Sequence, residues 1–263
     1  MNRNLFLCLL VLCASCSPTA EDGQTSVSRV ESPAAEVPLK RSSQGDPEEA
    51  ERRNKAGMSH YKKGRFDRAV AEFEAAVEAD PTYHWGHYNL ACTLGIFHSR
   101  GYSCDYGDKS RITDHLKIFM QLKPDLREKM RKDADLTSAR DTFLFQTLIG
   151  LSVTNTDDVT QILQRVSWYG PGHGARGPTS GVDFKAGGAV EFWAADFVTL
   201  ERMRGASGRY SVKGNKVFLE LKGTGGSQGK RVTGTLGPDG RLSLPGVAGV
   251  DSVFTDDPDD CSA

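Results

Sequence analysis

The stretch YKKGRFDRAVAEF, which runs from Tyr61 to Phe73, decides the fold. Its apolar residues recur three or four positions apart, and this is the spacing of one face of an α-helix. The pattern predicts one helix on each side of a turn at Lys63-Gly64-Arg65, over Pro47–Lys63 and Phe66–Ala79. Asp46 can cap the first helix, and Asp80-Pro81 ends the pair.

This helix pair resembles a tetratricopeptide repeat, in which small residues let two antiparallel helices approach and large residues fill the gap between them. The residues that carry the resemblance are Gly57, Tyr61, Gly64, Phe66, Ala69, Phe73, Ala76 and Pro81. The repeat has a period of about 34 residues, which places a second first-helix at His84–Cys92. Its partner is expected at Ser110–Leu122, and the extra residues fall in a loop at His98–Lys109.

A closing segment is expected after Pro124. A short helical stretch, Asp125–Lys132, precedes Asp133–Phe145, which resembles the segment that ends some tetratricopeptide groups. The end of such a helical stack needs a cap, because its apolar face would otherwise meet water. We therefore expect a helical domain over residues 46–150.

The pattern changes after Leu151, and residues 151–263 are expected to form a mainly antiparallel β domain, a small sheet or barrel. One last helix is expected at Thr156–Val166. The clearest hairpin turns at Gly214-Asn215 and pairs Tyr210 with Leu219 and Val212 with Val217. The other expected hairpins join Val182 and Phe184 to Val190 and Phe192, and Val232–Leu236 to Leu242–Leu244. The hairpins are weakly similar to those of lipocalin-like envelope domains, and the fold class is α + β with two domains.

The first 15 residues are typical of a signal peptide, since Arg3 precedes an apolar run, Leu5–Ala14, about half as long as a membrane span. The run ends in Leu12-Cys13-Ala14-Ser15-Cys16, which resembles the lipobox of bacterial lipoproteins, with Cys13 where that family prefers Leu. The resemblance implies cleavage before Cys16 and lipidation of Cys16, with palmitate as one acyl chain. A plain signal peptide cleaved nearby is the alternative. Residues 16–45 are expected to be a disordered tether, because they nearly lack large apolar residues.

These features place the mature protein in the bacterial cell envelope, anchored by lipid to a membrane, and we expect the outer membrane. A net charge of −1 argues against nucleic-acid binding, because there is no charge surplus to release counterions. It argues equally against a polybasic membrane patch.

No set of catalytic residues stands out, and we expect neither an enzyme, a cofactor nor a metal. Gly172–Gly177 has the glycine spacing of a dinucleotide loop, but Pro178-Thr-Ser-Gly181 cannot open the helix that such a loop requires. The acidic run Asp256–Asp260 lacks the glycine and glutamate of a calcium loop. Two alternatives stay open: a metal held among His84, His87, Cys92, His98 and Cys104, and a Cys92–Cys104 disulfide in place of a buried Cys92.

The resemblance implies a binding groove lined by one face of each first helix. By repeat position that face comprises Asn54, Met58, Tyr61 and Lys62 in the first repeat and Trp85, Tyr88 and Cys92 in the second. Tyr and Trp are frequent binding hot spots. The sequence thus predicts a non-enzymatic scaffold that binds a protein or peptide partner in the envelope. Trp85 and Tyr88 could instead pack under the inserted loop or against the β domain.

The alternative function is small-molecule or lipid binding by the β domain. Its aromatic residues, which could line a ligand cavity or form the domain's core, are Trp168, Phe184, Phe192, Trp193 and Tyr210.

Overall fold

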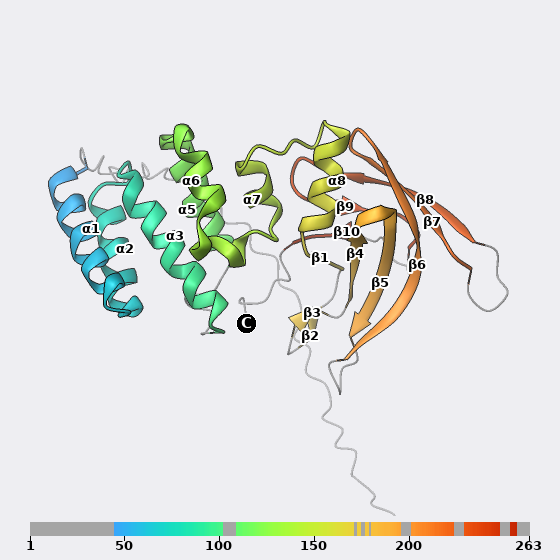
Figure 1. Ribbon diagram of the computed structural model, residues 1–263, viewed down its shortest axis with the longest axis horizontal. Helices are drawn as coiled ribbons and strands as arrows, with labels where there is room; N and C mark the ends of the chain where they lie inside the picture. The colour runs from blue at the N-terminus through green and yellow to red at the C-terminus, as the bar shows by residue number, and fades with distance from the viewer. Residues whose placement is uncertain are drawn as a thin grey trace, which may run out of the picture. The chain divides into compact units, whose positions relative to one another are not determined.

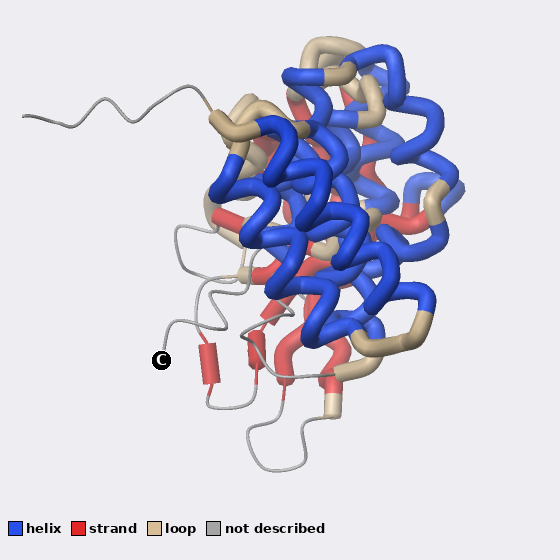
Figure 2. The backbone as a smooth tube through the Cα atoms, turned by 90° about the vertical axis from the view of Figure 1, so that its left-hand side faces the viewer, coloured by secondary structure: helices blue, strands red, loops and turns tan. Residues whose placement is uncertain are grey.

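The computed structural model describes residues 45–101, 109–170, 173–174, 177–178, 180–195, 201–223, 229–247 and 253–256, all within one compact unit, Ser42–Ala263. The fold class is α + β, as expected: a helical region is followed by antiparallel strands (Figure 1). In Figure 2, seen from the helical side, the helices lie in front of the strands. None of the described helices combines the length and the apolar character needed to cross a bilayer.

The first helical hairpin consists of α1 (Pro47–Lys62) and α2 (Phe66–Ala79), as the sequence predicts. The Asp46 carboxylate accepts a hydrogen bond from the Glu49 N–H at 3.0 Å and so caps α1. Gly57 permits close packing, because a Cβ atom there would lie 2.5 Å from the Phe73 ring. Gly64 makes the turn with a φ of +68°, which a side chain would disfavour.

The second hairpin consists of α3 (His84–Ser99) and α5 (Lys109–Leu122). The closing segment is broken into short pieces: η1 (Pro124–Leu126), α6 (Arg127–Lys132), η2 (Ala134–Ala139) and α7 (Phe143–Leu148). Its apolar residues Leu136, Ala139 and Phe145 are fully or almost fully buried in the helical core. The segment therefore covers apolar surface of the second hairpin, as a cap must.

Eight antiparallel strands form a nearly closed barrel. They pair in the order β1-β4-β5-β6-β7-β8-β9-β10. A backbone bridge between Tyr169 and Thr255, with N···O distances of 2.8 and 3.0 Å, joins β1 to the residue after β10. The bounds are β1 Trp168–Tyr169, β4 Ser180–Lys185, β5 Ala189–Ala195, β6 Arg202–Lys213, β7 Lys216–Leu221, β8 Lys230–Leu236, β9 Leu242–Ser243 and β10 Val253–Phe254. A separate small ribbon pairs β2 (His173–Gly174) with β3 (Gly177–Pro178).

The registers of the expected hairpins are confirmed. β6 and β7 pair Tyr210 with Leu219 and Val212 with Val217, β4 and β5 pair Val182 with Phe192 and Phe184 with Val190, and β8 and β9 pair Leu236 with Leu242. A further 3₁₀ turn, η3 (Ala186–Gly188), connects β4 to β5. The alternation of apolar and polar residues fixes these registers. If one strand shifted by one residue against its partner, its apolar side chains would point to solvent and not to the core.

The last helix, α8 (Thr156–Arg165), packs onto the strands through Val159, Ile162 and Leu163. Four of the five aromatic residues of the expected set, Trp168, Phe184, Phe192 and Tyr210, share this β-region core. The Trp168 indole donates to the Leu163 carbonyl of α8 at 3.2 Å. The fifth, Trp193, lies beside this core, with its ring against Gly181 and the Arg202 guanidinium 4.0 Å above the ring centroid.

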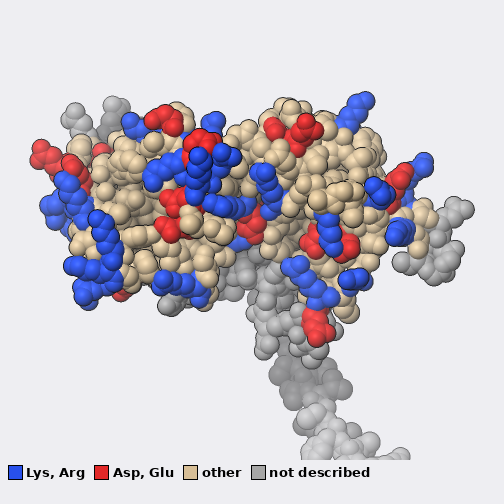
Figure 3. All heavy atoms as spheres, viewed as in Figure 1, with Lys and Arg blue, Asp and Glu red and all other residues tan. Residues whose placement is uncertain are grey.

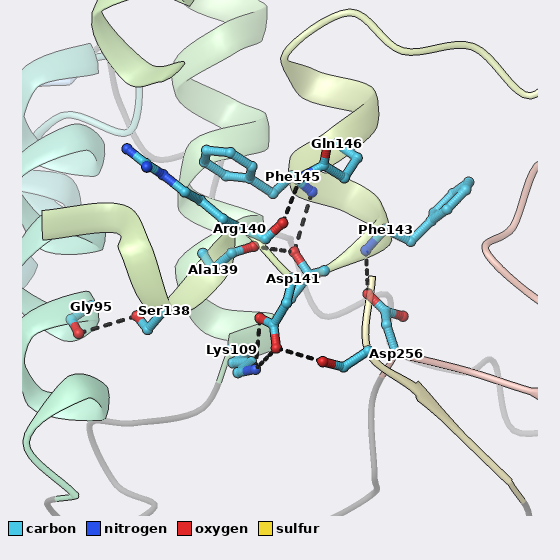
Figure 4. Close-up of polar contacts among 12 residues, drawn as sticks. Gly95, Lys109, Ser138, Ala139, Arg140, Asp141, Phe143, Phe145, Gln146 and Asp256 are labelled. Carbon is cyan, nitrogen blue, oxygen red and sulfur yellow. Dashed lines mark hydrogen bonds and ion pairs between the residues drawn. The ribbon is translucent and has the colours of Figure 1, made fainter. Parts of the chain in front are cut away.

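The two cores meet at α7, where Phe143 belongs to the β-region core and Phe145 to the helical core. Figure 4 shows the polar contacts that hold this junction. The Asp141 carboxylate pairs with Lys109 Nζ at 2.7 Å and accepts from the Ser167 hydroxyl at 2.9 Å. The Asp256 carboxylate accepts from the Phe143 N–H at 2.6 Å. The helical region and the barrel therefore share contacts through residues 141–145, a few residues before the domain boundary that the sequence predicts at 150/151.

Candidate functional site

The residues of the expected groove lie on neighbouring surfaces of α1 and α3, which we call the helical face: Asn54, Met58, Tyr61, Lys62, Trp85, Tyr88 and Cys92. Side-chain amides join the two helices. Asn89 Nδ2 donates to Asn54 Oδ1 at 2.8 Å, and Asn54 Nδ2 donates to the Tyr83 hydroxyl at 3.4 Å. Asn89 was not among the expected residues, although its position four residues after Trp85 places it on the same side of α3.

Part of the helical face is covered by the chain's own Asp133–Ala139 segment. The Tyr61 hydroxyl donates to the Asp135 carboxylate, and the Tyr88 hydroxyl donates to Asp133 Oδ2 at 2.5 Å. Gly95 permits this approach, because a Cβ atom there would lie 2.3 Å from the Asp135 carbonyl oxygen. The helical face is therefore built from α1, α3 and residues 133–139, and the sequence predicts only the first two of these segments.

Burial divides the face into an inner and an outer part. Tyr88 is 2% exposed and Cys92 is 5% exposed, so neither offers contact area to a partner in this structure. Met58, Tyr61 and Trp85 are half-buried, and Lys62 is exposed. The rings of Trp85 and Tyr88 pack against each other and against Phe119 of α5, with ring centroids 4.6–6.2 Å apart, and Lys129 Nζ lies 4.8 Å above the Tyr88 ring. The outer part, Met58, Trp85 and Lys62, is what the face presents to solvent.

Three side chains of the helical face, Tyr61, Tyr88 and Cys92, are held in their neutral, protonated form. Burial raises the pKa of both the Tyr61 and the Tyr88 hydroxyl. The Asp135 carboxylate raises the pKa of Tyr61 further, and Cys92 and the Asp133 carboxylate raise that of Tyr88 further. Burial also raises the pKa of the Cys92 thiol, and both carboxylates add to that shift. The tyrosines thus stay hydrogen-bond donors at neutral pH, and Cys92 is a weak nucleophile because little thiolate is present.

One group among the described residues could offer three ligands to a metal ion: the Cys92 thiol and the carboxylates of Asp133 and Asp135, whose ligand atoms lie within 4.8 Å of one another. Sulfur and oxygen ligands suit zinc. Both carboxylates already accept hydrogen bonds from tyrosines, and Lys129 Nζ lies 3.9 Å from Asp133. The tyrosine hydroxyls and the Lys129 ammonium therefore already compensate the charge of these carboxylates without a metal ion. Of the histidines in the alternative metal set, His87 contacts His115.

The His87–His115 pair lies between α3 and α5. His87 Nε2 is 3.0 Å from the Pro81 carbonyl, which can only accept, so this nitrogen carries the proton. The Nδ1 atoms of His87 and His115 are 3.0 Å apart, so His115 Nδ1 donates when both rings are neutral. Burial lowers the pKa of both rings, that of His115 to about 4, with His87 and Arg111 adding to the shift of His115.

The low pKa of His115 predicts that the free energy of unfolding decreases as the pH is lowered. The unfolded His115 takes up a proton near its ordinary pKa of about 6.5, whereas the folded ring resists protonation until about pH 4. The contribution is therefore fully present above about pH 6.5 and is lost between that pH and about 4, by up to roughly 3 kcal/mol. Urea unfolding of wild type and His115→Gln at pH 7.5 and pH 5 measures it. The free energy of unfolding is expected to drop less between pH 7.5 and pH 5 in the variant than in wild type. Equal drops would refute the assignment of this pH dependence to His115.

Several expected features lie outside the described residues: the signal peptide, the lipidation site Cys16, nearly all of the tether, and Cys104. Cys92 is a free thiol in this structure. No protein-family model matches the chain, and a search of curated protein sequences finds no significant match. The helical face is therefore the candidate site on its geometry alone.

Proposed function

We propose that the protein is a lipid-anchored envelope protein that acts as a non-enzymatic scaffold. Its helical hairpins are tetratricopeptide repeats, and their face holds a peptide or protein segment of a partner. The observation that supports this proposal is the pairing of α1 with α3 through Asn54 and Asn89, two helices on which Met58, Lys62 and Trp85 keep exposed surface.

Trp85 is the residue best suited to anchor a partner. It is half-buried, so part of its ring stays accessible while Tyr88 and Phe119 hold the rest. A ring that is already fixed loses little conformational entropy on binding, and this favours affinity. The Tyr88–Asp133 and Tyr61–Asp135 hydrogen bonds fix the surface beneath it.

The membrane attachment is proposed from the lipobox-like Leu12–Cys16 run. Several acyl chains on Cys16 would anchor the protein stably, since a single chain binds a bilayer only marginally. A tether of about 30 residues would then let the folded part reach partners on the membrane or away from it. The outer membrane remains the location we propose.

The alternative, ligand binding by the β region, has less support. Four of its five aromatic side chains are 1–8% exposed and belong to a core that α8 shares. These rings pack on one another and on aliphatic residues, as core residues do.

The scaffold proposal predicts that Trp85→Ala lowers partner capture from solubilised envelopes by about 30-fold, because hot-spot truncations cost about 2 kcal/mol or more. Tagged full-length protein serves as bait, and recovered partner is quantified by mass spectrometry. Phe218→Ala is the matched control, since Phe218 is a 37% exposed aromatic residue on β7. Thermal unfolding of both variants checks that they are folded. Equal capture by wild type and a folded Trp85→Ala would rule out the helical face.

A further inference from the structure

A group of positive side chains surrounds the turn between α1 and α2. We call it the basic edge: Lys62, Lys63, Arg65, Arg68 and Arg100. All five are exposed, and the acidic residue among them is Asp67. Figure 3 shows Lys and Arg side chains gathered at the lower left, where α1 turns into α2. The charge is local, because the whole chain is nearly neutral.

Ion pairing among the described residues does not account for the basic edge. Elsewhere in the helical region cations meet carboxylates, as in Arg53–Glu72 at 3.2 Å, Arg111–Glu74 at 3.0 Å and Lys55–Glu51 at 2.7 Å. Within the described residues, no carboxylate forms a salt bridge with any of the five cations of the edge. The ion pairs of the described residues therefore leave these five charges uncompensated.

Helix stability does not account for all of them either. Lys62 and Lys63 lie at the carboxyl end of α1, where cations are favourable, but Arg65 and Arg68 lie at the amino end of α2, where they are not. Arg65 occupies the N-cap position of α2 and makes no side-chain capping bond. The amino ends of α1 and α8 carry acidic residues, Glu48 and Glu49, and Asp157 and Asp158. The amino end of α5 carries Lys109 and Arg111, but these pair with the Asp141 and Glu74 carboxylates. Arg65 and Arg68 share the amino end of α2 with Asp67, and unlike the cations of α5 they form no salt bridge within the described residues, so neither helix stability nor ion pairing accounts for them.

The basic edge continues the helical face. Lys62 belongs to both, and the Arg100 guanidinium lies 4.7 Å above the Phe66 ring. The Phe66 ring in turn packs edge-on against Tyr61 of the face, with centroids 5.5 Å apart. A segment bound along the face could therefore extend over the edge without leaving the surface.

We propose that the basic edge binds an acidic stretch of the partner polypeptide, rich in Asp and Glu, next to the part held by the helical face. This inference rests on the proposed function and names the chemistry of its partner. Continuity with the face favours a polypeptide over a lipid surface. The large exposed apolar side chains among the described residues, Met203, Phe218 and Val253, all lie on the barrel, so none is at the edge to insert into a bilayer. Complementary charge at a rim chiefly raises the association rate and the specificity.

The test places a photo-crosslinking amino acid at position 67, within the edge, in the full-length protein in native envelopes. Mass spectrometry then identifies the crosslinked segment. The expected adduct is a polypeptide segment with a clear excess of Asp and Glu. The double variant Lys63→Glu/Arg68→Glu is expected to lower the adduct yield by about tenfold, since charge steering contributes tenfold or more to association rates. Lys213→Glu/Lys216→Glu, an equal charge change at exposed lysines of the β6–β7 hairpin, is expected to leave the yield unchanged.

Other outcomes overturn the inference. These are an adduct with phospholipid or lipopolysaccharide, a crosslinked segment without excess acid, no adduct at position 67, or equal losses in the edge and hairpin variants. Trp85→Ala separates this failure from that of the proposed function. If Trp85→Ala abolishes partner capture while the edge variant does not alter it, the scaffold proposal stands and the acidic partner is refuted. If neither variant alters capture, both proposals fail.

Discussion

Trp168→Ala is expected to lower the free energy of unfolding by about 3–5 kcal/mol, the range for truncating a fully buried aromatic residue. Trp168 is 1% exposed and is among the largest fully buried side chains of the described residues. It belongs to β1, which pairs with β4 through Val182 and, at Tyr169, bridges to Thr255. Its indole also donates to the Leu163 carbonyl, so truncation leaves that acceptor without this donor.

Urea unfolding followed by circular dichroism measures the effect. The matched control is Phe218→Ala, whose 37% exposed ring should cost well under half as much. The variant is also expected to weaken the contact of α8 with the strands, so α8 amides should exchange hydrogen faster. A loss below about 1 kcal/mol would mean that the closure of the barrel does not depend on the Trp168 ring.

Gly95→Val is expected to cost about 3 kcal/mol, the upper end of the usual range for overpacking. A Cβ atom at this position would lie 2.3 Å from the Asp135 backbone carbonyl oxygen, and a backbone atom cannot rotate away as a side chain can. The Asp133–Ala139 segment has to move off α3. This breaks the hydrogen bond from Ser138 Oγ to the Gly95 carbonyl and loosens the bonds of Tyr61 and Tyr88 to the two aspartates.

Thiol labelling measures this movement independently of stability. In wild type Cys92 is buried and its pKa is raised by that burial, so it should react slowly with a maleimide. In Gly95→Val the thiol should react at least about tenfold faster, with labelled peptides mapped by mass spectrometry. Ala71→Val, which adds a β-branched side chain at an exposed position of α2, is the control. Unchanged labelling of Cys92 in a folded Gly95→Val protein would show that the segment does not depend on Gly95.

Local patterns explain why most elements could be predicted. Helical spacing around Gly64 placed α1 and α2, and the Gly214-Asn215 turn fixed the register of β6 and β7. The closing segment was less predictable in form. It breaks into η1, α6, η2 and α7 because tertiary contacts, such as the buried Leu136 and the shared Phe143 and Phe145, decide its path. No local pattern shows that one helix of six residues joins two cores.

The candidate site was predictable in part. Spacing put the expected residues on α1 and α3, but it could not show that Asp133 and Asp135 would meet Tyr88 and Tyr61, which lie 45 and 74 positions away in sequence. It gave no sign of the His87–His115 pair for the same reason. The whole-chain charge also hid the basic edge, since acidic residues elsewhere balance it. Contacts between residues distant in sequence, and charges gathered on one part of the surface, can be identified only from the folded structure.

The most direct test of the helical face as the partner-binding surface compares two photo-crosslinking positions in native envelopes, Met58 on the face and Phe218 on the barrel. We expect position 58 to give a discrete protein adduct that Trp85→Ala abolishes, and position 218 to give none. An adduct at position 218 alone, or one at position 58 that persists in a folded Trp85→Ala variant, would contradict the assignment of partner binding to the helical face.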